Sequence, residues 1–119
     1  MTYQQHVIGK TAEQIACQYL LAESLTLVVR NYTCRFGEID LIMQDRDFLV
    51  FIEVRTRSNQ NYASALESID YRKQQKLINT AQFYLQTHHL IDKVPCRFDV
   101  IAVSFTQNGH NFDWIKNAF

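Results

Sequence analysis

The stretch GEIDLIMQDRDFLVFIEVRTR, from Gly37 to Arg57, decides the fold. Two apolar runs flank a short charged turn, a pattern that predicts a β-hairpin. Each run nevertheless carries acids: Glu38 and Asp40 interrupt the first, and Glu53 interrupts the second. Carboxylates among leucine, isoleucine, valine and phenylalanine are costly unless a proton or a cation balances them. The hairpin is therefore the first place to look for a functional site.

The register of this hairpin predicts which acids meet. A turn centred on residues 46–47 places Asp40 directly opposite Glu53. The same register places Glu38 opposite Arg55. Opposed side chains on one face have Cβ atoms about 4.5–5.5 Å apart, so two carboxylates there repel each other. A hard divalent cation, Mg²⁺ or Mn²⁺, would relieve the repulsion. A salt-bridge cluster, in which Arg55 neutralises Glu38 and one neighbour, explains the same residues, and spacing alone does not separate the two interpretations.

The remaining pattern predicts one α/β domain over residues 1–119, with helices packed on a mixed sheet in the order α-β-β-β-α-β and a further strand at the end. A capping box at Thr11 and Gln14 predicts the start of the first helix. The expected elements are a helix over 11–24, strands over 25–32, 38–44 and 48–57, a helix over 70–87, and strands over 96–105 and 111–115.

Composition excludes several classes of protein. Twelve basic residues balance twelve acidic ones, so any basic surface that binds nucleic acid must be local. The three cysteines form no CxxC pair, which favours free thiols in a reducing compartment over a disulfide frame or a zinc site. No signal peptide and no apolar run long enough to cross a bilayer is present in the sequence. We therefore expect a cytoplasmic protein without a membrane partner.

Several blocks of the sequence carry a resemblance. GEID in one strand and EVR thirteen residues after its aspartate resemble the metal-binding core of the PD-(D/E)XK nuclease superfamily. The blocks NYTCRFGEIDLI, FIEVRTR, KQQKLINTAQFYL, RFDVIAV and the terminal NAF resemble the bacterial YraN family, which is similar in fold to archaeal Holliday-junction resolvases. The resemblance covers nearly the whole chain and implies a three-layer restriction-endonuclease-like fold.

The resemblance also implies a metal site for Mg²⁺ or Mn²⁺. Asp40 and Glu53 match the two metal-holding acids, and the backbone carbonyl of Val54 would be a further ligand. Glu13 matches the acid that the first helix of resolvase-like relatives contributes. Glu38 has two interpretations, as a supplementary ligand or as the ion-pair partner of the arginine opposite it.

Arg55 occupies the place of the motif lysine, and this is a departure from the nuclease pattern. Arginine keeps the positive charge and can clamp a phosphate through two N–H groups. It stays protonated at any relevant pH, so it cannot act as a base. Electrostatic stabilisation of a transition state survives this change, whereas proton transfer by this residue does not.

A local basic stretch adds candidate phosphate contacts. Between Arg55 and Lys76 five basic residues stand against two acidic ones. The residues that we expect to contact a nucleic-acid backbone are Arg57, Arg72, Lys73, Gln74 and Lys76. The start of the second helix favours phosphate, and the YraN pattern has a lysine where Lys73 stands. A solvated helix face is the alternative.

Two functions are open at this point. The first is a metal-dependent endonuclease that cleaves phosphodiester bonds in DNA, including branched or repair intermediates. The second is a nuclease-fold module without strong catalysis that binds nucleic acid or a protein partner. The resemblance to resolvases also implies a homodimer. Elsewhere, Arg97 and Asp99 lie two positions apart in one strand and predict a structural ion pair, with a role in the site as the alternative.

Overall fold

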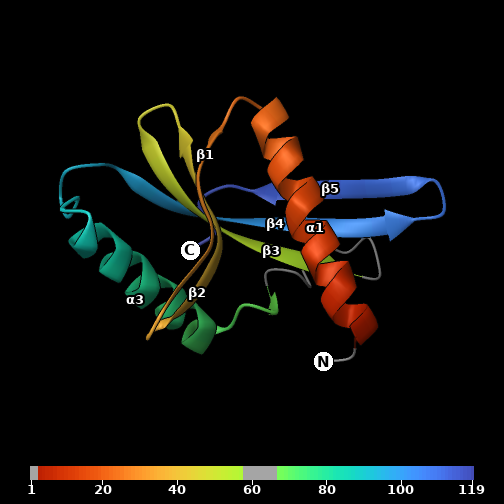
Figure 1. Cartoon of the computed structure of the whole chain (residues 1–119), viewed down its shortest axis with the longest axis horizontal. Coiled ribbons are helices and arrows are strands. Elements are labelled where there is room, and N and C mark those ends of the chain that lie inside the picture. Colours follow the sequence, from red (N-terminus) through yellow and green to blue (C-terminus); the bar gives the residue numbers. More distant parts are fainter. Residues whose placement is uncertain (1–2, 58–66) are drawn as a thin grey trace.

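A computed structural model describes residues 3–57 and 67–119, with side chains from Ile8 onward (Figure 1). The elements in chain order are α1 (Tyr3–Ala22), β1 (Thr26–Cys34), β2 (Gly37–Asp45), β3 (Phe48–Arg57), α3 (Tyr71–Thr87), β4 (Cys96–Thr106) and β5 (Gly109–Ile115). The predicted α/β class and order of elements are confirmed. Within the described ranges, no helix is both long and apolar enough to pass through a membrane.

The five strands form one mixed sheet in the order β1-β2-β3-β4-β5. β1, β2 and β3 pair antiparallel, β3 and β4 pair parallel, and β5 returns antiparallel along β4. The parallel pair needs a crossover because β3 and β4 run in the same direction, and α3 lies in that connection. The sheet therefore has its antiparallel hairpin on one side and its parallel pair in the middle.

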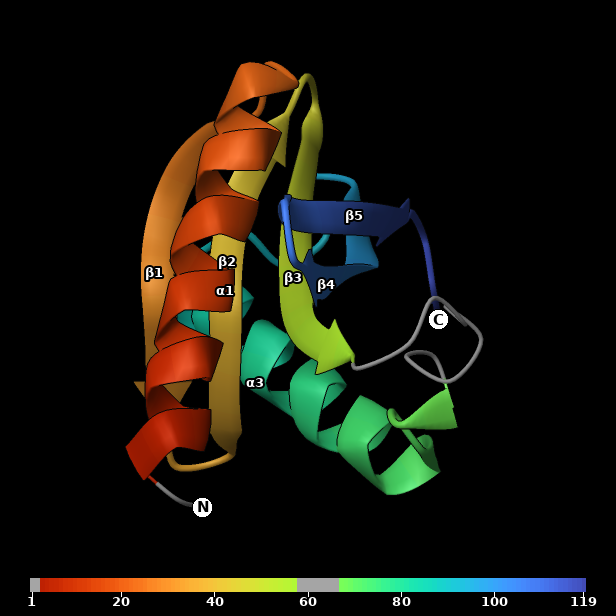
Figure 2. The same cartoon turned by 90° about the vertical axis from the view of Figure 1, so that its right-hand side faces the viewer.

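The sheet separates between β2 and β3. Their ladder runs from Asp45–Phe48 to Leu41–Ile52 and does not continue to Asp40 and Glu53. Beyond that point β2 stays paired with β1 as far as Gly37, while β3 stays paired with β4 as far as Arg57. Figure 2 shows the two strands close together at their shared turn and apart at the other end. We call this divergence the fork.

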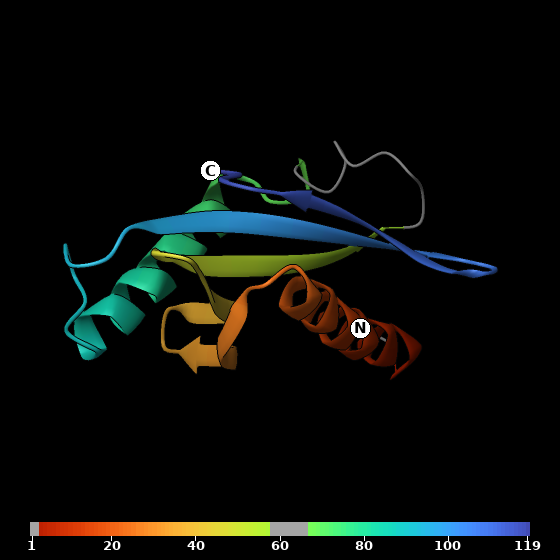
Figure 3. The same ribbon diagram turned by 90° about the horizontal axis from the view of Figure 1, so that it is seen from above.

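Two apolar clusters cover the two faces of the sheet. On one face α1 contributes its buried stripe, including Ala16 and Leu20, against residues such as Ile52 and Ile101. On the other face α3 packs Leu77 and related side chains against a second set of strand residues. Figure 2 shows α1 in front of β1 and β2, and Figure 3 shows α1 and α3 on opposite sides of these two strands. The predicted three-layer, nuclease-like arrangement is therefore confirmed.

The helix boundaries test two sequence signals. Asp70, where the second helix was expected to begin, caps α3, because its Oδ1 accepts a hydrogen bond from the Lys73 amide at 2.9 Å. The expected start of the first helix at Thr11 is wrong, since α1 begins at Tyr3 and Thr11 lies inside it. The residues before Thr11 include no proline and only one glycine, so nothing stops the helix from extending toward the N-terminus.

Gly37 fixes the β1–β2 turn against α3. Its φ of +151° is one that L side chains rarely adopt, and a Cβ built there would lie 3.0 Å from Thr80 Oγ1. The Thr80 hydroxyl is itself held by a 2.7 Å hydrogen bond to the Lys76 carbonyl. The close approach of turn and helix thus requires a residue without a side chain.

We predict that Gly37→Ala lowers the free energy of unfolding by more than about 1 kcal/mol, because backbone strain and the contact with Thr80 add. Urea denaturation followed by circular dichroism measures the change. Gly109→Ala is the matched control, since Gly109 has a φ of +145° and no neighbour within 4 Å. Equal losses in the two variants would show that the close approach contributes nothing.

Candidate functional site at the fork of the sheet

Asp40 lies where β2 and β3 part. Its Oδ2 accepts a hydrogen bond from the Val54 amide at 2.8 Å. A side chain thus replaces the backbone acceptor that a continued ladder would have supplied. The carboxylate lies in the gap between the two strands, which explains how the sheet accepts an acid at this point.

Two residues of β3, Glu53 and Arg55, lie near Asp40 of β2. The Asp40 and Glu53 carboxyl groups come within hydrogen-bonding reach of each other, so that one proton can lie between them. Arg55 Nη2 approaches Glu53 Oε2 at 3.7 Å, which is longer than a hydrogen bond. The Glu53 and Arg55 side chains are 18% and 25% exposed, so both can be reached from solvent.

A hollow of about 300 Å³ opens on the α3 side of the fork. Its charged lining comes from three elements: Glu38 on β2, Glu53 and Arg55 on β3, and Lys73 and Lys76 on α3. Of the residues predicted from the sequence, these five are brought together. We call this space the site hollow.

A smaller hollow of about 190 Å³ lies on the α1 side of the fork. It is lined by Glu13 and Asp40, among other residues, so the structure also places the predicted first-helix acid near Asp40. Asn31 was missed by sequence reasoning, yet it borders this hollow with a φ of +51° and a buried Oδ1 that has no partner in the described chain. No local signal marks Asn31, because only the pairing of β1 with β2 brings it beside Asp40.

One of the two interpretations of Glu38, an ion pair with Arg55, is wrong. The strands separate before these residues can face each other, and Glu38 instead pairs with Thr33 of β1. Arg55 approaches Glu53 on its own strand. Both residues still line the site hollow, so Glu38 remains available as a supplementary ligand.

A family model for the uncharacterised protein family UPF0102 matches residues 12–103 of this chain. The chain belongs to family UPF0102. This is the YraN family, so the resemblance seen in the sequence blocks is confirmed. The match includes Glu13, Asp40, Glu53 and Arg55, so all four residues at the fork lie in the part shared with the family.

Relatives from several bacteria support the same assignment. The chain is 50% identical over 111 residues to UPF0102 proteins of Stutzerimonas stutzeri and of Legionella pneumophila, covering 93% of this chain and 92% of each relative. A UPF0102 protein of Nitrosococcus oceani is also 50% identical over 111 residues, with 93% and 90% covered. The similarity therefore extends over nearly the full length of each chain.

Some residues predicted to contact nucleic acid have other partners in this UPF0102 chain. Arg57 is only 5% exposed, pairs with Asp113 on β5 and donates from Nε to Ser104 Oγ at 2.8 Å. Gln74 donates from its side-chain amide to the Ile69 carbonyl at 3.1 Å, at the start of its own helix. Arg72 is exposed and does not line the site hollow. The sequence pattern did not distinguish these three residues from Lys73 and Lys76, which line the site hollow.

The donor set fits a hard divalent cation. Asp40 and Glu53 supply two carboxyl groups in close approach. Val54, between Glu53 and Arg55 in the sequence, has the backbone carbonyl that was expected as a further ligand. Among the described side chains, no three from histidine, cysteine, aspartate and glutamate gather as one metal cluster. A cation at the fork would therefore rely on backbone and water oxygens for its remaining ligands, as Mg²⁺ commonly does.

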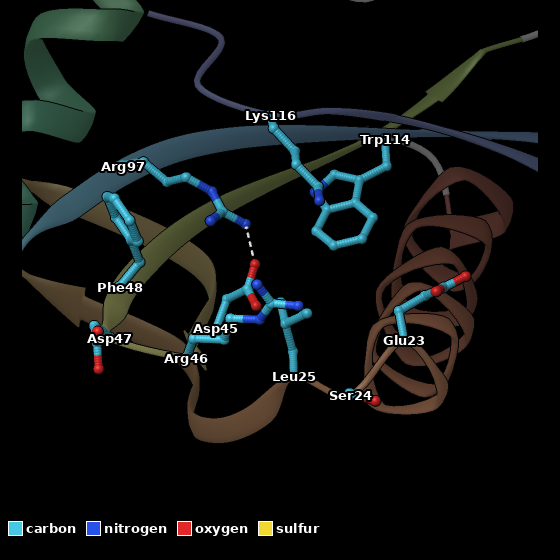
Figure 4. Close-up of a pocket in the computed structure, with 10 residues that line it drawn as sticks. All are labelled: Glu23, Ser24, Leu25, Asp45, Arg46, Asp47, Phe48, Arg97, Trp114 and Lys116. Atoms are coloured by element: carbon cyan, nitrogen blue, oxygen red, sulfur yellow. Dashed lines mark hydrogen bonds and ion pairs between the residues drawn. The ribbon is translucent and has the colours of Figure 1, made fainter.

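A separate hollow of about 540 Å³ lies near the β2–β3 turn and the end of α1 (Figure 4). One of its acids, Asp45, is already paired: Arg97 Nη2 donates to Asp45 Oδ2 at 2.7 Å, and Arg97 Nε donates to Asp99 Oδ1 at 3.0 Å. Trp114 Nε1 also donates to Asp99 at 2.8 Å. The predicted Arg97–Asp99 pair is confirmed, and its balanced charges make this hollow a weaker candidate than the fork.

The surroundings of the Asp40 carboxyl group at the fork raise its pKa. Burial is the largest cause that raises the pKa of Asp40, followed by the hydrogen bond and the negative charge of Glu53. The Val54 amide and the Arg55 charge act in the opposite direction but do not offset them. The pKa of Asp40 is raised to about 8 as a result. Without a cation, this carboxyl group holds a proton at neutral pH.

We predict that the metal-free protein loses stability as pH rises from about 4 to about 8. Over that range the unfolded chain has released the Asp40 proton and the folded chain retains it, so the free energy of unfolding falls with pH. Each unit between the two pKa values corresponds to about 1.4 kcal/mol, and we expect a loss of at least about 1 kcal/mol. Urea midpoints measured with a chelator across this range test the effect.

Asp40→Asn keeps an oxygen for the Val54 amide and removes the titration, so its stability should change less with pH. Asp47→Asn, at an exposed carboxylate in the turn, is the control and should behave as the wild type. The same pH dependence in wild type and Asp40→Asn would contradict the placement of a shared proton at the fork.

Proposed function

We propose that this chain is a metal-dependent phosphodiesterase that acts on nucleic acid, with its reactive centre at the fork. The observation that carries the proposal is the close approach of Asp40 and Glu53 beside a hollow that Arg55, Lys73 and Lys76 also line. Two carboxyl groups held this close together suit a metal ion, and the cations on the wall of the site hollow suit phosphate. This combination is the chemistry that hydrolysis of a phosphodiester requires.

Asp40, Glu53 and the Val54 carbonyl would hold Mg²⁺ or Mn²⁺, with Glu13 and Glu38 as supplementary acids. A bound ion supplies polarisation of a phosphoryl oxygen and a lowered pKa of a coordinated water. The carboxylates of the chain would determine the position of the ion and, through it, the position of the phosphate. Asp40 is held by the Val54 amide, so its position does not depend on the ion.

Arg55 would stabilise the negative charge that builds on the phosphoryl group. Its Nε is buried without a partner in the described chain, and its approach to Glu53 is long, so the guanidinium has capacity for a phosphate. It stays protonated and cannot remove a proton from water. Its role is therefore electrostatic.

Lys73 and Lys76 would contact the nucleic-acid backbone. Both are exposed and stand on successive turns of α3 at the wall of the site hollow. Lysine contacts to phosphate set the position of a strand without reading its bases, so little sequence preference is expected. DNA, including branched or repair intermediates, is the proposed substrate, and the homodimer implied by resolvases stays a prediction.

We predict that the wild type binds Mn²⁺ and that Asp40→Asn weakens this binding by at least about tenfold. Loss of a residue that only hydrogen-bonds to a metal ligand typically lowers metal affinity by about tenfold or more, and loss of a direct ligand should lower it at least as much. Isothermal titration calorimetry measures both affinities. Glu53→Gln should behave like Asp40→Asn, whereas Asp47→Asn in the exposed turn should bind as the wild type does. No binding at millimolar Mn²⁺, or equal binding by all four proteins, would refute the metal site.

The second candidate is a binding module with little or no catalysis. Arg55 favours it, because a group that cannot exchange a proton replaces the lysine of the nuclease motif. The fork would then hold nucleic acid, or a protein partner, without cutting a strand.

Arg55→Lys distinguishes the two candidates. If this position alone limits the reaction, the variant should nick supercoiled DNA in Mg²⁺ about 10²-fold or more faster than the wild type, the lower range for a positioned acid or base. Gel assays of nicked plasmid give the rates, and Arg55→Lys with Asp40→Asn is the inactive control. Metal binding without nicking by either Arg55 form would favour the binding module.

A further inference from the structure

A second face of α3 and the β1–β2 turn enclose a hollow of about 550 Å³ next to the site hollow. Its lining combines one cation, two phenylalanine rings and three amide side chains: Arg35, Phe36, Phe83, Asn79, Gln82 and Gln86. None of the carboxylates in the described chain lines it. We call it the aromatic–amide hollow.

The two rings and the cation form one cluster at the surface. The Phe36 and Phe83 centroids lie 5.7 Å apart, and the Arg35 guanidinium lies 4.9 Å from the Phe36 centroid and 5.8 Å from that of Phe83. Phe36 is 39% exposed although it is large and apolar. An exposed ring beside a guanidinium offers flat surfaces on which a further planar group can stack.

The amide side chains follow one stripe of α3. Asn79, Gln82 and Gln86 are spaced three and four residues apart, so they share a face of the helix, and all three are exposed. Within the described chain, their side chains make no hydrogen bond. An amide carries both donors and an acceptor, which can pair with the polar edges of an unpaired base.

The aromatic–amide hollow borders the site hollow. Phe36 directly precedes Gly37, which lines the site hollow, and Asn79 lies one helical turn after Lys76, which also lines it. A strand whose phosphates contact Lys76 could therefore place its neighbouring bases against Phe36. The positive charge of Arg35 and of both lysines, with no acid in the aromatic–amide hollow, suits a polyanion better than an acidic or neutral protein surface.

We propose that the aromatic–amide hollow is a subsite for unpaired bases of a single-stranded nucleic acid segment that enters the site hollow. This inference rests on the proposed function for its neighbour but concerns a different set of residues. It names the substrate class as nucleic acid with an unpaired stretch beside the point of attack. Bases in an intact duplex are stacked on each other and cannot occupy the subsite.

Fluorescence anisotropy in a chelator tests the subsite without metal or cleavage. The probes are a short fluorescein-labelled oligo(dT) and a duplex of the same length. We expect the wild type to prefer the single strand, and Phe36→Ala to weaken single-strand binding about 5- to 150-fold, the range for losing one stacked base. Phe36→Trp should retain the affinity, because it keeps a stacking ring.

Phe48→Ala is the matched control. Phe48 is also exposed, at 40%, and also has a guanidinium near its ring, with Arg97 at 5.6 Å. It lies at the start of β3, away from the fork. Its removal should leave oligo(dT) binding unchanged. The double variant Gln82→Ala, Gln86→Ala provides an independent test on the helix, and should weaken binding without removing a ring.

The outcomes separate this proposal from the proposed function. Loss of oligo(dT) binding in Phe36→Ala with no Mn²⁺ binding by the wild type would support the subsite and refute the metal site. Mn²⁺ binding with equal affinity of wild type and Phe36→Ala for oligo(dT) would refute the subsite alone. Equal affinity of the wild type for duplex and single strand would also overturn the subsite. Sedimentation would overturn it too, if Phe36→Ala weakened binding only because it dissociated a dimer of this chain.

Discussion

The hydrogen bond from the Val54 amide to the Asp40 carboxylate is the interaction on which the candidate site depends. Two neighbouring strands can part only if their freed backbone groups find other partners. Asp40 supplies one such partner with a side chain and so ends the β2–β3 ladder without leaving the Val54 N–H unpaired. The fork is thus a stable feature of the sheet, and the hollows on its two sides exist because the strands separate there.

The same arrangement explains how a chain with no net charge can gather charged side chains at one place on its surface. Positive charge gathers on α3 and at the end of β3, around the acids of the hairpin, while the other end of the sheet neutralises its own acids with Arg97. Family UPF0102 is uncharacterised, so membership establishes the relationship of this chain to its relatives but not its chemistry. Acids and cations on facing walls, rather than the fold alone, carry the proposed function.

Much of the fold was predictable because local signals agreed with it. The hairpin register was right from Asp45–Phe48 to Leu41–Ile52, and α3 began within one residue of its predicted start at Asp70. What the sequence could not show was where the ladder would stop, since that depends on a side chain competing with the backbone across two strands. For this reason the Glu38–Arg55 pair failed. The partners of Arg57 lie on β4 and β5, far along the chain, and no local pattern reveals them.

The parallel pairing of β3 with β4 has a consequence for how the molecule is made. Leu49 pairs with Cys96, and the intervening chain must cross over through α3 before this contact can form. During synthesis the hairpin therefore emerges well before its partner strand, with the apolar edge of β3 still unpaired. Such an edge is a template for pairing with other chains. Nascent chains are thus most exposed to aggregation in the interval between the emergence of β3 and that of β4.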